Sequence, residues 1–276
     1  TADPKTEKAV AAPQSEKLVL YSGRSQVLVE GILKDFTAET GIEVETRFDK
    51  STQALANRLA SEGAKTDADL FFAQDSGYLG ALSAKGLLKK LPADILGTVP
   101  THNQAPEGHW VATSGRARVL VFDPQKVKAE ELPKSLQGLA DARWKGQLGW
   151  APSNASFQAH VSALRHLWGE TKTEAWLKSI QELEPKTYPK NSPQVKAVSN
   201  GEITIGWVNH YYLHKLRAAN PELKAANYSF AQDGDAGNLM MLSGIGITSA
   251  SKNTAAAEKL VRYLLSEKVQ TRFTQE

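Results

Sequence analysis

Short runs typical of β-strands alternate with longer runs of helical spacing through the first third of the chain. Strands are predicted at residues 17–22, 42–48 and 68–72, and helices at residues 27–40, 51–63 and 78–87. The glycine at position 41 is a helix stop signal between the first helix and the second strand. This alternation predicts an α/β fold with a mostly parallel sheet and helices on both of its faces.

A second α/β pattern follows a long apolar run at residues 110–124, which exceeds the usual strand of about 5–6 residues. This run has Gly115 in its middle, and we expect it to cross between two lobes. Further strands are predicted at 148–151, 203–208 and 239–247, and further helices at 157–167, 173–183, 193–199, 212–219 and 254–273. A chain of 276 residues is long enough for one large or two ordinary domains.

Composition excludes several classes of function. The chain has no cysteine, which rules out disulfides, thiolate nucleophiles and zinc-thiolate sites and suits an oxidising, extracytoplasmic space. Its formal charge of +3 is small and spread out, so we expect no nucleic-acid partner. We also find no nucleophile elbow, phosphate-binding loop or His-Glu-x-x-His motif, and the chain is not predicted to be an enzyme.

The first sixteen residues are rich in Ala, Pro, Thr and charge and lack apolar periodicity. Residues 1–16 are therefore predicted to be a disordered leader, with any signal peptide already removed. No stretch approaches the roughly 20 consecutive apolar residues of a membrane span.

Small polar residues follow each of the first three predicted strands, at 22–25, 49–51 and 73–76. Ligands of open α/β sheets bind beyond the carboxyl ends of the strands, so these loops suit the wall of a cleft. They suit ordinary loops equally well, because Ser51 and Asp75 are good helix N-cap residues.

Two adjacent tyrosines stand at the end of the strand at 203–208, within the sequence Asn209-His210-Tyr211-Tyr212. Deprotonated phenols are hard oxygen ligands that match a highly charged cation such as ferric iron. An aromatic pair also supplies packing area, and the pattern alone does not decide between the two interpretations.

Six motifs together resemble the ferric-iron-binding substrate-binding proteins of bacterial ABC transporters, of the transferrin-like, tyrosine-pair type. They lie at residues 17–26, 67–77, 114–124, 149–159, 188–203 and 207–216. The resemblance implies a type II periplasmic-binding-protein fold, in which two lobes with mixed sheets are joined by crossing strands around a ligand cleft. The first lobe is expected at 17–117, completed by 242–276, and the second at 118–241, with hinges near 114–118 and 238–242.

The resemblance also implies a ligand set. Tyr211 and Tyr212 are expected to bind Fe(III) as phenolates. Many family members add a histidine and a glutamate from the first lobe, but Ser25 and Gln74 stand at those positions here. Asp75 is then a possible extra ligand, and Ser25 and Gln74 are possible cleft contacts.

We expect a synergistic anion to complete the coordination shell of the iron. This anion would be carbonate, phosphate or a small carboxylate. The family pattern assigns it to the residues Ser153, Asn154, Ala155, Ser156, Asn191 and Asn209. Arg24 and Arg116 are the candidates to grip it bidentately. His210 and His214 are expected to be packed or solvent-facing rather than ligands.

The resemblance predicts a monomeric protein that is periplasmic, or lipid-anchored at the outer face of the membrane. It would capture Fe(III) and deliver it to an ABC permease in the inner membrane. Family members usually continue for some tens of residues past the last predicted helices. A binding protein of the same fold for an organic or anionic solute, or for an iron chelate, is the alternative, because the first-lobe ligands are missing.

Overall fold

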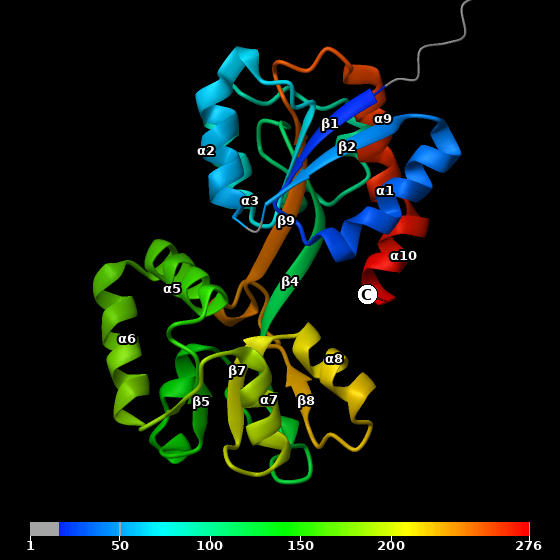
Figure 1. Ribbon diagram of the computed structural model, residues 1–276. Coiled ribbons are helices and arrows are strands. Elements are labelled where there is room, and N and C mark those ends of the chain that lie inside the picture. Colours follow the sequence, from blue (N-terminus) through cyan, green and yellow to red (C-terminus); the bar gives the residue numbers. More distant parts are fainter. Residues whose placement is uncertain (1–16, 50, 276) are drawn as a thin grey trace, which may run out of the picture. The chain divides into compact units, whose positions relative to one another are not determined.

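The computed structural model describes residues 17–49 and 51–275, and the predicted leader at 1–16 lies outside them. The chain divides into two compact units: unit 1 holds residues 17–114 and 242–275, and unit 2 is Gly115–Met241. It passes from one unit to the other inside two long strands, β4 (Val111–Phe122) and β9 (Met240–Ile247) (Figure 1). The single long strand predicted at 110–124 is confirmed.

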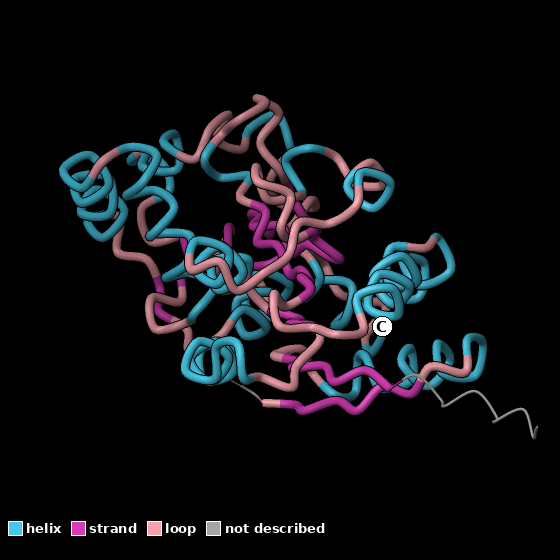
Figure 2. Tube along the Cα trace, turned by 90° about the horizontal axis from the view of Figure 1, so that it is seen from above, coloured by secondary structure: helices cyan, strands magenta, loops and turns pink. Residues whose placement is uncertain are grey.

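Unit 1 is a mixed sheet with helices on both faces. Its elements are β1 (Lys17–Ser22), α1 (Gln26–Thr40), β2 (Glu43–Phe48), α2 (Thr52–Glu62), β3 (Leu70–Ala73), α3 (Ser76–Ala84), α4 (Ala93–Leu96), the start of β4, the end of β9, α9 (Thr254–Leu265) and α10 (Glu267–Gln275). β1 pairs in parallel with β2 and β3, as the alternation predicted, and the pair β1–β2 can be followed in Figure 2. β9 then pairs with β3 in the antiparallel sense, so the sheet is not wholly parallel.

The two faces of this sheet follow from the alternation of side chains along β1. Leu18 and Leu20 pack in a core with residues of α1 and α9, whereas Tyr21 packs in a second core with residues of α2 and α3. Figure 1 shows α2 and α3 on one side of these strands and α1 and α9 on the other. The carboxyl ends of β1 and β3 therefore emerge next to each other, carrying Arg24 and Gln74.

Unit 2 is also a mixed sheet flanked by helices, but its strands follow one another in a different order. Its elements are the end of β4, β5 (Leu148–Trp150), α5 (Ala155–Trp168), α6 (Glu170–Glu182), β6 (Lys186–Thr187), α7 (Asn191–Ser199), β7 (Ile205–Asn209), α8 (Tyr211–Ala219), β8 (Ala226–Tyr228) and the start of β9. The strand order is β4-β7-β5-β6, with β8 also paired to β4. β7 lies antiparallel to β4 and parallel to β5.

Alternation along β4 again separates two cores. Leu120 and Phe122 pack with residues of α5 and α6, and Val119 and Val121 pack with residues of α7 and α8. Because β7 is buried throughout, the loops at its carboxyl end are held by both cores. The polar residues of the predicted tyrosine-pair motif lie there.

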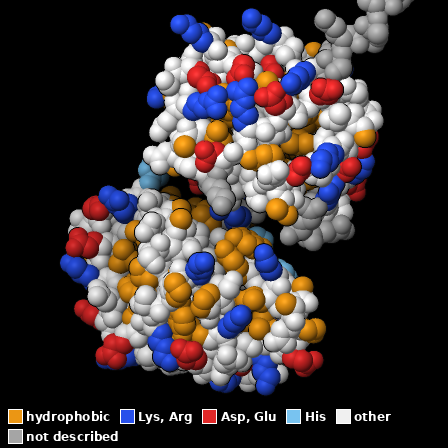
Figure 3. Space-filling view, viewed as in Figure 1, with side chains coloured by type: hydrophobic (Ala, Val, Ile, Leu, Met, Phe, Trp, Pro, Cys, Tyr) orange, Lys and Arg blue, Asp and Glu red, His pale blue; other side chains and the backbone are white. Residues whose placement is uncertain are grey.

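The helix caps expected at Ser51 and Asp75 are confirmed. The Ser51 hydroxyl accepts a hydrogen bond from the Ala54 N–H at 3.1 Å, and the Asp75 carboxylate accepts one from the Gly77 N–H at 2.8 Å. Among the described helices, none is long and apolar enough to cross a bilayer. On the face seen in Figure 3, positive and negative side chains are interspersed.

Candidate metal and anion site

Tyr211 and Tyr212 are the first two residues of α8, one residue after β7 ends. Their rings stack with centroids 4.4 Å apart and an interplanar angle of 30°, and both side chains are half-buried. Leu213 behind them is buried and anchors the helix in the unit 2 core. The two phenols therefore lie side by side on a short, fixed stretch of backbone.

Burial raises the pKa of Tyr211 to about 12, and a hydrogen bond to Tyr212 together with the charge of that neighbour acts in the same direction. A hydrogen bond from Asn209 and the positive charge of Arg116 favour the phenolate and oppose this shift. Tyr211 is thus a neutral phenol at pH 7 until a cation offsets the charge of its phenolate.

A buried arginine that the sequence analysis missed lies beside this pair. Arg118 of β4 is 1 % exposed, and its Nη1 donates to Asn209 Oδ1 at 2.9 Å, Asn191 Oδ1 at 3.2 Å and Ser156 Oγ at 3.4 Å. Its Nη2 donates to the Trp207 carbonyl at 2.9 Å. Burial lowers the pKa of Arg118 to about 9, and negative charge on Tyr211 and Tyr212 acts in the opposite direction. The guanidinium is therefore charged at neutral pH.

The amides and hydroxyls predicted to hold the anion form a single cluster around Arg118. Asn154 caps α5, accepting from the Ser156 N–H at 3.1 Å, and Asn191, the first residue of α7, donates to Asn154 Oδ1 at 3.4 Å. Asn209 ends β7. Two helix N-termini and one strand end thus bring these side chains together, and such termini favour negative charge.

The remaining candidate residues of unit 2 lie at the start of α5, on β4 and at the start of α8. Ser153 and Ala155 are exposed at the start of α5, and Arg116 is half-buried near Tyr211. His210 Nδ1 accepts from the Ala117 N–H at 3.1 Å, which leaves the proton of the neutral ring on Nε2. His210 is therefore a partly buried ring that accepts a backbone hydrogen bond, and His214 is exposed.

The candidate residues of unit 1 form a separate cluster. Arg24 is 7 % exposed, and its Nη1 donates to Gln74 Oε1 at 2.8 Å and Ser243 Oγ at 2.7 Å. Asp75 Oδ1 is engaged in the cap of α3, and Ser25 is exposed at the start of α1. Their participation in ligand binding stays a prediction.

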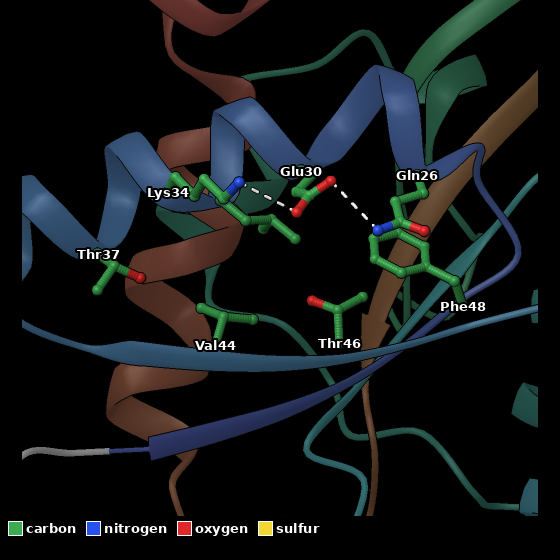
Figure 4. Close-up of a pocket in the computed structure, with 8 residues that line it drawn as sticks. Gln26, Glu30, Lys34, Thr37, Val44, Thr46 and Phe48 are labelled. Carbon is green, nitrogen blue, oxygen red and sulfur yellow. Dashed lines mark hydrogen bonds and ion pairs between the residues drawn. The ribbon is translucent and has the colours of Figure 1, made fainter.

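The described residues contain no group of three or more His, Cys, Asp or Glu side chains able to hold a metal. A cavity of about 390 Å³ in unit 1, between α1 and β2, does not supply one either. Figure 4 shows that Glu30 within it interacts with Lys34 and Gln26.

Two mixed α/β units, between which the chain passes twice inside long strands, define a type II periplasmic-binding-protein fold. Residues 65–276 match the family of bacterial extracellular solute-binding proteins. Within it, this chain belongs to the family of periplasmic ferric-iron-binding proteins.

Named relatives support this assignment over nearly the whole chain. The major ferric iron-binding protein of Neisseria meningitidis is 34% identical over 96% of this chain and 80% of its own length. Iron-bound HitA from Pseudomonas aeruginosa is 32% identical, with a TM-score of 0.78 over 95% of this chain and 84% of that one. The Trichodesmium protein IdiA (FutA), solved with iron and citrate ligands, is 29% identical, with a TM-score of 0.80 over 94% and 84% of the two chains.

Proposed function

We propose that this protein captures Fe(III) through the phenolates of Tyr211 and Tyr212, with a synergistic anion bound by the polar cluster beside them. The observation that carries the proposal is the convergence of a stacked tyrosine pair, two helix N-termini and a buried arginine at one end of β7. The names of the relatives, which specify ferric iron, support the same ion.

The chemistry of the donors favours a trivalent cation. A phenol with a raised pKa, as Tyr211 has, releases its proton only to a strongly charged, hard ion, and the described residues offer no thiolate or imidazole set that would suit softer metals. Two phenolates leave an iron ion short of its usual six donors, so an anion and water are needed to complete the shell. Arg118 and the helix N-termini offset the charge of that anion.

We further propose that the protein works as a monomer outside the cytoplasm and delivers iron to an ABC permease in the inner membrane. The family of extracellular solute-binding proteins and the periplasmic relatives support this location and partner. Attachment to the membrane by a lipid remains a prediction from the sequence.

The deciding experiment is a titration of apo-protein with Fe(III) in phosphate at neutral pH. Phenolate coordination produces a broad visible charge-transfer band, which we expect for the wild type and not for the Tyr211→Phe/Tyr212→Phe double variant. Tyr188→Phe is the matched control, because the Tyr188 hydroxyl binds Glu202 Oε1 at 2.9 Å elsewhere in unit 2. A colourless wild type, or a coloured double variant, contradicts the proposal.

Uptake of a preformed iron chelate is a second candidate function. The absence of a carboxylate-imidazole cluster among the described residues favours a ligand that brings its own donors, and one relative was solved with iron and citrate. Native mass spectrometry distinguishes the two: retention of one citrate per iron after buffer exchange into phosphate supports the chelate, and loss of citrate supports the simple ion.

A further inference from the structure

Arg118 is a buried cation with an unusual set of partners. Arg118 forms no ion pair with another described residue. Its Nε also has no hydrogen-bond partner among the described residues. A buried charge without an opposite charge is costly unless strong hydrogen bonds compensate it. Four oxygen acceptors supply that compensation: three side-chain oxygens and the carbonyl of Trp207.

These contacts determine which way two asparagine amides face. A guanidinium has only donors, so the atoms of Asn191 and Asn209 that meet it must be carbonyl oxygens. Their NH₂ groups are then directed to other partners. That of Asn191 lies 3.4 Å from Asn154 Oδ1, and that of Asn209 is left to donate toward the Tyr211 hydroxyl two residues on, whose pKa Asn209 lowers.

The position of Arg118 is itself fixed by the sheet. Arg118 and Asn209 are directly paired residues in the antiparallel register of β4 and β7, so their side chains share one face. The guanidinium also lies over the Trp207 ring, 5.5 Å from its centroid. Arg118 thus has little freedom to swing toward a ligand, and its effect must pass through the amides.

We propose, on the basis of the iron-binding function above, that Arg118 is a positioning residue that turns Asn209 into a fixed hydrogen-bond donor to the Tyr211 ligand oxygen. Arg118 does not bind the iron or the anion. It sets the electron density of one iron phenolate and holds the Asn191 amide in the matching orientation beside the anion.

The hydrogen-bond relay from Arg118 through Asn209 to Tyr211 has a spectroscopic consequence. A hydrogen bond donated to a phenolate, and a positive charge behind it, both withdraw electron density and move the phenolate-to-iron charge-transfer band to shorter wavelength. Loss of Arg118 frees the Asn209 amide to rotate, which removes the donor. The band should then move to longer wavelength, and a purely structural arginine would not produce this shift.

The test compares the Fe(III) complexes of wild type, Arg118→Met, Arg118→Lys and Asn209→Asp in phosphate at neutral pH. Arg118→Met should shift the band to longer wavelength and weaken iron binding by about 10- to 100-fold, the usual effect of removing a residue that orients a metal ligand. Arg118→Lys keeps the positive charge but can donate to fewer of the four oxygen acceptors. It should therefore recover part of the wild-type band position and part of the iron affinity. Circular dichroism of each apo-protein checks folding.

Asn209→Asp keeps the test valid if Arg118→Met does not fold. An aspartate can pair with Arg118 but has no N–H to offer Tyr211, so the band should move in the same direction in a stable protein. Lys215→Met, which removes an exposed charge from α8, is the control and should leave the band unchanged.

The outcomes separate this inference from the proposed function. A colourless wild type overturns iron binding and the relay with it. A coloured wild type whose band and affinity are matched by Arg118→Met and Asn209→Asp overturns the relay alone, and Arg118 is then part of the unit 2 core only. Shifts confined to these two sites, with partial recovery in Arg118→Lys, support the relay.

Discussion

At the scale of single residues, the proposed use of half-buried phenols as iron ligands requires proton release. Burial raises the pKa of Tyr211 to about 12, so this phenol is protonated in the apo-protein at neutral pH. Under the proposed coordination, each phenolate ligand gives up one proton when iron binds, so protons compete with iron as the pH falls.

We therefore predict that iron affinity falls by about 100-fold per pH unit between pH 7 and pH 5, tenfold for each proton released. Competition with a chelator of known proton and iron equilibria measures the slope at constant phosphate. Tyr211→Phe should reduce the slope to about tenfold per pH unit because one proton fewer is released. An unchanged slope in this variant would mean that Tyr211 is not a phenolate ligand.

A second residue-scale effect concerns His160, which is fully buried on α5. Its Nε2–H donates to the Ala236 carbonyl at 2.6 Å, Nδ1 has no partner among the described residues, and its ring lies 4.9 Å from that of Trp207. Burial first, and the charge of Arg118 second, lower the pKa of His160 to about 3. The ring is therefore neutral in the fold.

We predict acid destabilisation through His160. In the unfolded chain its pKa is about 6.5, so the unfolded state binds more protons between pH 6.5 and pH 3, and stability is lost as the pH falls through this window. At pH 5 the loss is about 2 kcal/mol relative to pH 7. Urea unfolding at both pH values should show this difference shrinking in His160→Gln, which can still donate to Ala236. An equal difference in both proteins would exclude His160 as the cause.

At the scale of elements, the site depends on how closely α7 packs on β7. A side chain at Gly206 would place Cβ 2.9 Å from Val121 Cγ1 and 3.2 Å from Gln194 Cβ. Gln194 Oε1 in turn accepts from the Trp207 N–H at 3.0 Å, which fixes α7 to the strand. The position of Asn191 at the start of α7 follows from this contact.

We predict that Gly206→Ala lowers the free energy of unfolding by about 1–3 kcal/mol, as overpacking usually does, and also weakens iron binding in phosphate. Gly80→Ala on α3 is the control, because a Cβ there meets nothing within 4 Å and alanine favours a helix by up to about 1 kcal/mol. Thermal unfolding and iron titration check both variants. Normal stability in Gly206→Ala would show that α7 can move aside without cost.

The elements themselves were largely predictable from the sequence, and their pairings were not. Apolar periodicity located α1, the long β4 and the strand that precedes the tyrosines, because burial on one or two faces leaves a clear period. Strands β6 and β8 were missed because two or three residues carry no period. The antiparallel pairing of β9 with β3 depends on contacts between residues far apart in the chain.

The arginine of the site shows the same limit. Arg116 and Arg118 are two residues apart on one strand, so alternation places both on one face, and only Arg116 was predicted to bind the anion. What buries Arg118 is its register opposite Asn209, which is 91 residues away in the sequence. Ser156, Asn191 and Asn209, which contact Arg118, were grouped from the sequence only through the family resemblance, and their role in anion binding is still a prediction.

At the scale of the whole molecule, the chain distributes its candidate residues unequally. Unit 2 contains the tyrosine pair, Arg118 and every amide of the anion cluster, whereas unit 1 contributes Arg24 and Gln74, already bonded to each other. With Ser25 and Gln74 at the positions of the family's first-lobe ligands, the proposed iron and anion ligands are concentrated in one contiguous segment of the chain.

We predict that Fe(III) and phosphate together protect backbone amides at three places in unit 2: the start of α5, the start of α7, and the turn from β7 into α8. Hydrogen–deuterium exchange followed by mass spectrometry measures this, with iron alone and phosphate alone as the comparisons. Because the anion and the metal complete one shell, protection should be largest when both are present. Added protection at the ends of β1 and β3 would show that Arg24 and Gln74 join the bound state. Protection confined to unit 1 would contradict the assignment of the site to the tyrosine pair.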